Sequence, residues 1–74
     1  MASEADAIRV KNDCRAELVA AAGVFGLMVR RDEAGGWIVQ VLVDPSAPLP
    51  GDRLLDGVPI RHVHEDRPTP LRRG

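Results

Sequence analysis

The feature that most constrains this fold is a pair of apolar runs joined by a short charged turn. The runs are Val24–Arg31 (VFGLMVRR) and Trp37–Val43 (WIVQVLV), and both are rich in β-branched or large apolar side chains. The residues between them, DEAGG, end in two glycines, which supply the positive φ angles that a hairpin turn needs. The sequence therefore predicts a β-hairpin over residues 24–43.

Both faces of this hairpin are apolar. Side chains alternate along a strand, so Trp37, Val39 and Val41 lie on one face of the second run, and Ile38 and Leu42 lie on the other. A single helix covers only one face of a small sheet, which leaves the second face or an edge to be covered by something else. We expect either a protein partner there, or the proline-rich loop and the C-terminal tail folded back over the sheet.

The segment before the hairpin has the pattern of a helix. Apolar residues recur at spacings of three and four and mark one helical face: Ala7, Val10, Cys14, Leu18 and Ala21. Ser3 suits the N-cap, and Gly23 suits the C-terminal end, where a left-handed residue is needed. We predict one helix over residues 4–22, whose small apolar side chains lie close on the sheet.

A third strand is expected after a proline-rich crossing. The stretch DPSAPLPGD carries three prolines, which fit neither a helix nor a central strand, so it is predicted as a loop. Val58–His64 follows a DG turn signal and is predicted as a strand. The predicted fold class is α+β: an N-terminal helix packed on a small, mainly antiparallel three-stranded sheet. Residues 1–66 form the single predicted domain, and residues 67–74 form a flexible basic tail.

Length and composition exclude several classes of protein. A chain of 74 residues is one domain at most, and one this short buries only about 60% of its unfolded surface. Ten basic and eleven acidic residues, with one Trp and one Phe, give neither a basic surface nor a stacking platform for nucleic acid. No apolar run approaches the roughly 20 residues of a membrane helix. The single cysteine, Cys14, excludes an internal disulfide and leaves either a reducing, cytoplasmic setting, which is the simpler choice, or an intermolecular bridge.

The sequence offers one weak metal-ligand pattern. His62 and His64 stand two apart in the predicted third strand, so their rings point to the same side and have the spacing of two ligands. Cys14, Glu65 and Asp66 are the side chains available to complete such a set. The same pair also fits two partly exposed histidines at a strand edge. A small metal-binding protein therefore stays an alternative, and no metal or cofactor is predicted.

Catalytic motifs are missing from the sequence. The only serines, Ser3 and Ser46, do not lie in a Gly-x-Ser-x-Gly setting, and no glycine-rich phosphate loop is present. The one thiol has no evident histidine partner by sequence logic. The prediction is a protein that is not an enzyme and has no catalytic residue.

Three motifs carry a resemblance to a known kind of module: GVFGLMV, GGWIVQVLVDP and LPGDRLLDGVPIRHV. Over residues 18–63 the chain resembles a small bacterial helix-plus-three-strand (αβββ) module with Gly-Val-x-Gly and DGVPVRV-type strands. Such modules occur alone or beside trypsin-like serine peptidases, and their layout is similar to the small lobe of serine-peptidase propeptides. The resemblance implies the fold and an accessory role, and it implies no catalytic residue.

Two further resemblances are partial. FGLMV, WIVQVLV and PGDRLLDGVPI are similar to PDZ domains, which implies a peptide binder, but only fourteen residues follow Ile60, too few for the rest of a PDZ groove. The ending PLRRG resembles the tail of ubiquitin-like modifiers, which implies conjugation through Gly74. Those modifiers end in two glycines and begin with a hairpin, so the likeness is confined to the tail.

These observations predict a non-enzymatic protein–protein interaction module. Its partner is expected to be a second copy of the chain, as a homodimer, or a peptidase or effector protein. The residues expected in the core and in contacts, including the tail, are Met28, Trp37, Val39, Val41, Arg72, Arg73 and Gly74.

Overall fold

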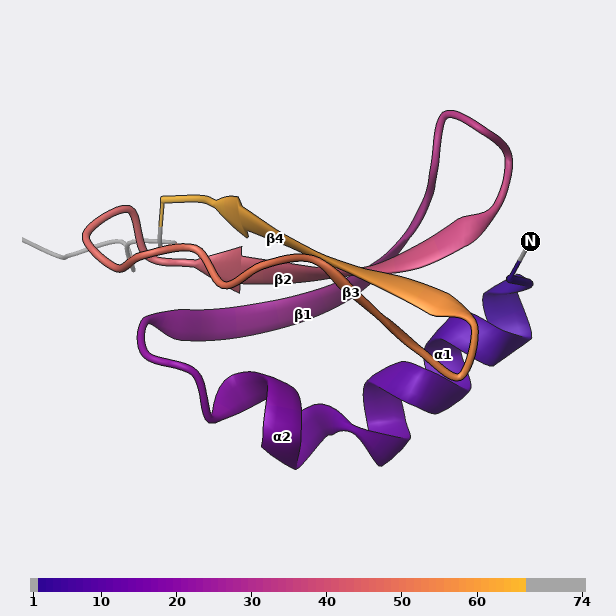
Figure 1. The fold of residues 1–74 in the computed structure, drawn as a ribbon, viewed down its shortest axis with the longest axis horizontal. Helices are drawn as coiled ribbons and strands as arrows, with labels where there is room; N and C mark the ends of the chain where they lie inside the picture. The colour runs from indigo at the N-terminus through magenta and orange to yellow at the C-terminus, as the bar shows by residue number, and fades with distance from the viewer. Residues whose placement is uncertain (1, 67–74) are drawn as a thin grey trace, which may run out of the picture.

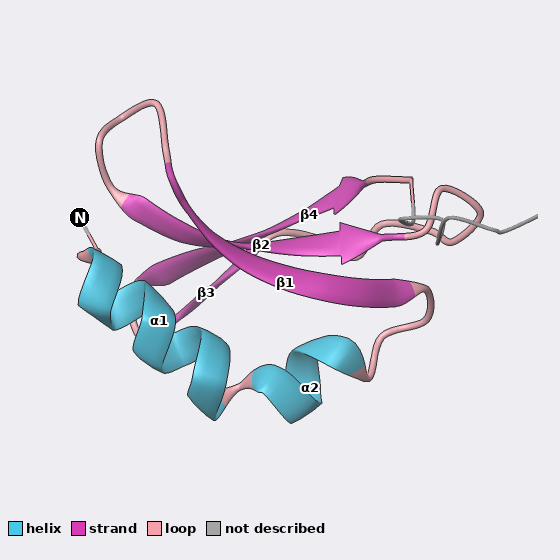
Figure 2. Ribbon diagram, turned by 180° about the vertical axis from the view of Figure 1, so that it is seen from behind, coloured by secondary structure: helices cyan, strands magenta, loops and turns pink. Residues whose placement is uncertain are grey.

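The computed structural model describes residues 2–66 as one helical layer on one sheet (Figure 1). The elements along the chain are α1 (Glu4–Asp13), α2 (Arg15–Val19), β1 (Val24–Arg31), β2 (Trp37–Val43), β3 (Arg53–Leu55) and β4 (Val58–His64). Both helices lie on the same side of the sheet, as the reverse view in Figure 2 also shows. The α+β class is therefore confirmed. The predicted tail, with Arg72, Arg73 and Gly74, lies outside the described residues.

The sheet differs from the prediction in strand number and direction. Its order is β1-β2-β4-β3, with β1 and β2 antiparallel, β2 and β4 parallel, and β3 and β4 antiparallel. The prediction of three mainly antiparallel strands is wrong because residues 44–52 carry the chain back past the sheet before it pairs again. The short β3 then turns directly into β4. Asp56 and Gly57 form that turn with φ angles of 50° and 78°, the two positive values of a type I′ hairpin.

The predicted single helix is interrupted at Cys14. The N-cap of α1 is Ser3, whose side-chain oxygen accepts a hydrogen bond from the Asp6 N–H, while the Asp6 carboxylate accepts one from the Ser3 N–H. These bonds from Ser3 lower the pKa of Asp6. Cys14 leaves the helical conformation with φ −105° and ψ 10°. The cause is local, since Asn12, Asp13 and Cys14 are adjacent residues of low helix propensity.

The chain leaves α2 and enters β1 through a tight corner at Gly23. Gly23 has a φ of 81°, as predicted for a left-handed residue, but the predicted helix end at residue 22 is wrong, because α2 ends at Val19 with Ala20 as its C-cap. A Cβ at this position would collide with the Cβ of Ala47 in the 44–52 loop. The Gly23 carbonyl also accepts a hydrogen bond of 2.8 Å from the Asp44 N–H. This contact ties the start of β1 to the end of β2.

The core lies between the helices and the central strands. The fully buried side chains come from both layers: Ala7, Val10, Leu18, Val39, Val41, Val43, Val58 and Ile60. The predicted helical face is thus confirmed at Ala7, Val10 and Leu18, and Cys14 packs against the same cluster. Burial of one such valine or leucine stabilises the fold by about 1.5–3 kcal/mol. Among residues 2–66, neither helix has the length and apolar run needed to cross a membrane.

Candidate interaction surface

The face of the sheet opposite the helices is uncovered within the described chain (Figures 1 and 2). The register places these side chains on it: Met28, Arg30, Ile38, Gln40, Leu42, Leu54, Pro59, Arg61 and Val63. Leu54 is 67% exposed and Met28 is 39% exposed, whereas Leu42 and Val63 are half-buried. We call this set the open face. It combines apolar side chains at its margins with a polar centre.

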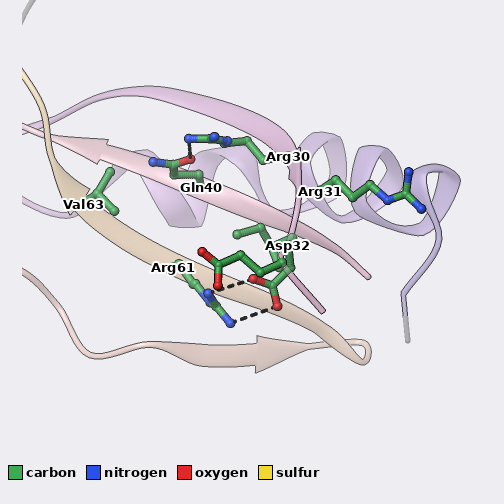
Figure 3. Close-up of a pocket in the computed structure, with 8 residues that line it drawn as sticks. Arg30, Arg31, Asp32, Gln40, Arg61 and Val63 are labelled. Carbon is green, nitrogen blue, oxygen red and sulfur yellow. Dashed lines mark hydrogen bonds and ion pairs between the residues drawn. The ribbon is translucent and has the colours of Figure 1, made fainter. Parts of the chain in front are cut away.

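The polar centre of the open face is a hollow of about 330 Å³ (Figure 3). The Arg61 guanidinium forms a two-pronged ion pair with Asp32, with N···O distances of 3.2 and 3.3 Å. Arg30 donates from Nη1 to the side-chain oxygen of Gln40 at 3.2 Å. Arg31 also lines this hollow, and in Figure 3 its guanidinium points away from Arg30 and Arg61.

The arginines also shield the floor of this hollow. Ile38 is only 6% exposed although it lies on the open face, and Gln40 is only 9% exposed. Both line the hollow together with Arg30 and Arg61. The aliphatic stems of arginines cover apolar surface in this way while their charged ends stay in water. The centre of the open face is therefore covered by its own arginine side chains, while its margins are apolar.

The β1 edge of the sheet carries outward-facing backbone groups. At the hairpin, the Asp32 N–H donates to the Gly36 carbonyl at 2.6 Å, so these two residues form a hydrogen-bonded pair. Such pairs alternate along an antiparallel ladder. The backbones of Met28 and Arg30 therefore face β2, and those of Leu27 and Val29 face away from it. Within residues 2–66, no strand pairs with β1 on that outer side.

The opposite edge is closed by the chain itself. β3 pairs with the first part of β4, from Val58 to Ile60. Beyond β3, the carboxylate of Asp52 accepts a hydrogen bond of 3.3 Å from the His62 N–H. The ring Nε2 of His64 lies 2.6 Å from the carbonyl oxygen of Ala47. The outer edge of β4 is thus covered along most of its length.

The predicted histidine pair lies on the helical side of this closed edge. His62 lines a second hollow of about 330 Å³ with Leu18 and Arg53. Its Nδ1 is buried and has no hydrogen-bond partner among residues 2–66. Burial lowers the pKa of His62, the nearby Asp52 carboxylate raises it, and Arg53 lowers it further.

A metal site is not assembled around these histidines in the described chain. His64 is hydrogen-bonded to the loop, and Cys14 lies at the helix break against the core. Glu65 and Asp66 are exposed. No three His, Cys, Asp or Glu side chains within residues 2–66 are grouped closely enough to hold a metal ion.

The residues predicted for contacts are placed in different environments. Val39 and Val41 are fully buried under the helices, so they are core residues. Trp37 packs against that core, and its backbone N–H donates to the Ala2 carbonyl at 3.0 Å. Of the four predicted contact residues that the structure describes, Met28 alone lies on the open face. Its contact role stays a prediction.

Sequence reasoning missed the polar centre of the open face. Arg30 and Gln40 are ten residues apart, and Asp32 and Arg61 are 29 apart, so their contacts depend on strand pairing. One local signal was available, because Gln40 is the single polar residue in the run WIVQVLV. A lone polar side chain in a central strand indicates a partner on a neighbouring strand.

No family model, no curated protein and no solved structure matches the chain. What is shown is a small α+β domain with helices on one face of a mixed four-stranded sheet. The features of this domain that bear on its function are the open face and the two unequal edges of the sheet.

Proposed function

We propose that this domain is a non-enzymatic protein–protein interaction module whose partner covers the open face. The observation that supports this most is the placement of both helices on one side of the sheet, with Leu54 and Met28 exposed on the other. A sheet buries an apolar face against a second layer in stable domains. The two exposed apolar side chains flank a polar centre that contains Arg30 and Arg61, and protein interfaces are enriched in both methionine and arginine.

Arg30 and Arg61 would give this interaction its specificity. Arginine is enriched at protein interfaces because its planar group offers several N–H donors in a fixed geometry. Arg61 uses two of its nitrogens for Asp32, and Arg30 uses one for Gln40. The remaining donors point to a partner surface that is apolar and carries carboxylates opposite the two arginines. We propose an accessory role of this kind in the cytoplasm, beside a peptidase or effector protein.

The test is site-specific photocrosslinking in cells that express the protein. A photoreactive amino acid replaces Leu54, which is 67% exposed on the open face. The matched control replaces Ile8, which is 43% exposed on α1, on the helical layer. We expect a discrete protein adduct from position 54 that excess wild-type protein competes away and that is absent from position 8.

The competitor Leu54→Glu should fail to displace that adduct, because it places a charge in the apolar margin of the open face. Equal adducts from both positions, or none from position 54, would show that the open face is not a contact surface.

A further inference from the structure

The β1 edge has the features of a self-pairing surface. Leu27 and Val29 present backbone N–H and C=O groups away from β2, where no strand of residues 2–66 pairs with them, and such an open edge acts as a template for another strand. The opposite edge offers far fewer free backbone groups to another strand, because β3 and Asp52 occupy it. The usable stretch of β1 is short. A β-bulge lies between Val24 and Gly26, and Arg31 follows at the other end.

We propose that β1 pairs antiparallel with β1 of a second copy of this chain, around a two-fold axis that passes beside Met28. This rests on the proposed function and deepens it, because the second copy would double the open face that the proposed partner covers. In this register the outward-facing Leu27 lies opposite the outward-facing Val29 of the second copy. Each of these pairs exchanges two backbone hydrogen bonds, and the symmetry generates the pair twice.

The side chains on the open face fit this register. The two Met28 residues meet at the axis as a non-hydrogen-bonded pair, the arrangement in which facing side chains lie closest. Arg30 lies opposite Gly26 of the second copy. Gly26 has no side chain, and an added Cβ there would lie 3.2 Å from Leu42 Cδ1. The arginine stem can therefore extend over Gly26 toward the apolar Leu42.

Repulsion between the two Arg30 side chains favours the axis at Met28 over an axis at Val29. An axis at Val29 would place Arg30 of the two copies on a cross-strand diagonal, only about 7–8 Å apart. The axis at Met28 separates them by four residues along the strand, or about 14 Å. That distance exceeds the Debye length of about 8 Å at physiological ionic strength, so the repulsion is largely screened.

The consequence for function is a larger contact surface. Both open faces would lie on the same side of one continuous sheet, because a strand added at an edge extends the sheet in its own plane. The hollows that contain Arg30 and Arg61 would then occur twice, on either side of the axis. A partner that is itself two-fold symmetric would fit this surface.

Disulfide trapping tests the register directly. The variant Met28→Cys is made in a Cys14→Ala background, which removes the only native thiol. Facing residues in a non-hydrogen-bonded pair have Cα atoms within the range that a disulfide spans. We expect a cross-linked dimer to form in an air-equilibrated or glutathione redox buffer at least about tenfold faster than for Leu54→Cys, because pairing raises the effective thiol concentration.

Leu54→Cys is the matched control, since it is exposed on the same face but lies at the closed edge. Arg30→Cys in the same background should also cross-link slowly, because Gly26 and not Arg30 faces it. If Met28→Cys reacts no faster than Leu54→Cys, the pairing is overturned. If Arg30→Cys reacts fastest, the axis is misplaced and the register is overturned.

Sedimentation equilibrium of the uncross-linked protein completes the test. We expect a monomer–dimer equilibrium that Met28→Lys weakens at least about tenfold, since two ammonium groups would meet at the axis. Leu54→Lys should leave it unchanged. A wild-type protein that stays monomeric at every concentration would overturn the self-pairing. The photocrosslinking at position 54 would be unaffected by that result, so the proposed function can stand or fail separately.

Discussion

The two edges of the sheet are finished in different ways. At the β4 edge, the chain adds the three-residue β3 and then directs Asp52 at the His62 N–H. At the other edge, the eight-residue β1 has a partner on one side only within the described chain. Charged side chains and a bulge are the usual protection of such an edge, and β1 has both only at its ends.

The difference shows how a short chain divides its residues. The loop of residues 44–52 and β3 cover the β4 edge, and the helices cover one face. The middle of β1 and the open face remain uncovered by residues 2–66, and they adjoin at Met28. The closed edge should therefore depend on contacts within the chain, and the β1 edge on contacts with a partner.

The largest predicted effect comes from removing the buried side chain of α2 that packs beneath the closed edge. Leu18 in α2 is 3% exposed and lies beside His62 and Arg53. Leu18→Asp should destabilise the domain by about 4 kcal/mol or more, because it removes a buried side chain and places a charge in the core. Thermal unfolding followed by circular dichroism measures this. Ala16→Asp on the exposed side of α2 is the control, and an equal loss there would mean that the helix is wrongly oriented.

The next effect concerns the side chain that closes the edge. Asp52→Ala should lower the free energy of unfolding by about 1 kcal/mol, because the His62 N–H loses its acceptor. It should also lower the pKa of His62 further, since the Asp52 carboxylate raises that pKa in the native protein. Urea denaturation and an NMR pH titration measure the two effects. Asp52→Asn keeps an acceptor oxygen and should restore most of the stability.

The pH dependence of stability sharpens the comparison. Burial lowers the pKa of His62 below its ordinary value of 6.5, so the folded state favours the neutral ring. The unfolded chain therefore binds a proton first as the pH falls. Stability should be complete above pH 6.5 and decline as the pH falls through 6.5 toward the lowered pKa of the folded state.

Urea denaturation between pH 8 and pH 5 measures that decline. His62→Gln should remove this part of the pH dependence, because glutamine does not titrate. An unchanged decline in His62→Gln would show that other groups cause it.

The smallest effect is an ion pair on the same side of the molecule. Arg53 Nη2 of β3 lies 3.0 Å from Glu17 Oε1 of α2, and their side chains are 45% and 60% exposed. Glu17→Gln should cost only about 0.5 kcal/mol, as exposed pairs do. A loss that disappears in high salt would support this assignment. A loss above about 2 kcal/mol would show that the pair is structural for β3.

Local patterns in the sequence were enough for the hairpin, the strand at Val58–His64 and the buried helical face. Each depends on alternation or on helical spacing within one segment. The break at Cys14 was also local, but its low-propensity neighbours were outweighed by the apolar spacing around it. β3 was missed because Arg53–Leu55 is too short to show alternation.

The parallel pairing and the polar centre of the open face were beyond local patterns. Both depend on the path of residues 44–52, which places β4 beside β2. The three prolines in this segment predict only that it is a loop. Once β4 lies beside β2, Gln40 and Arg61 become register partners. Sequence alone therefore gave the apolar surfaces but neither their partners nor the edge that remains open.

Amide hydrogen exchange measured by NMR tests the contrast between the two edges most directly. The His62 N–H is bonded to Asp52 within the chain, whereas the Val29 N–H points away from β2. We predict that the His62 amide is protected at every protein concentration, and that protection of the Val29 amide rises with concentration and is absent in Met28→Lys. A Val29 amide that exchanges at the unprotected rate in the wild-type protein, even at the highest concentration, would contradict the account.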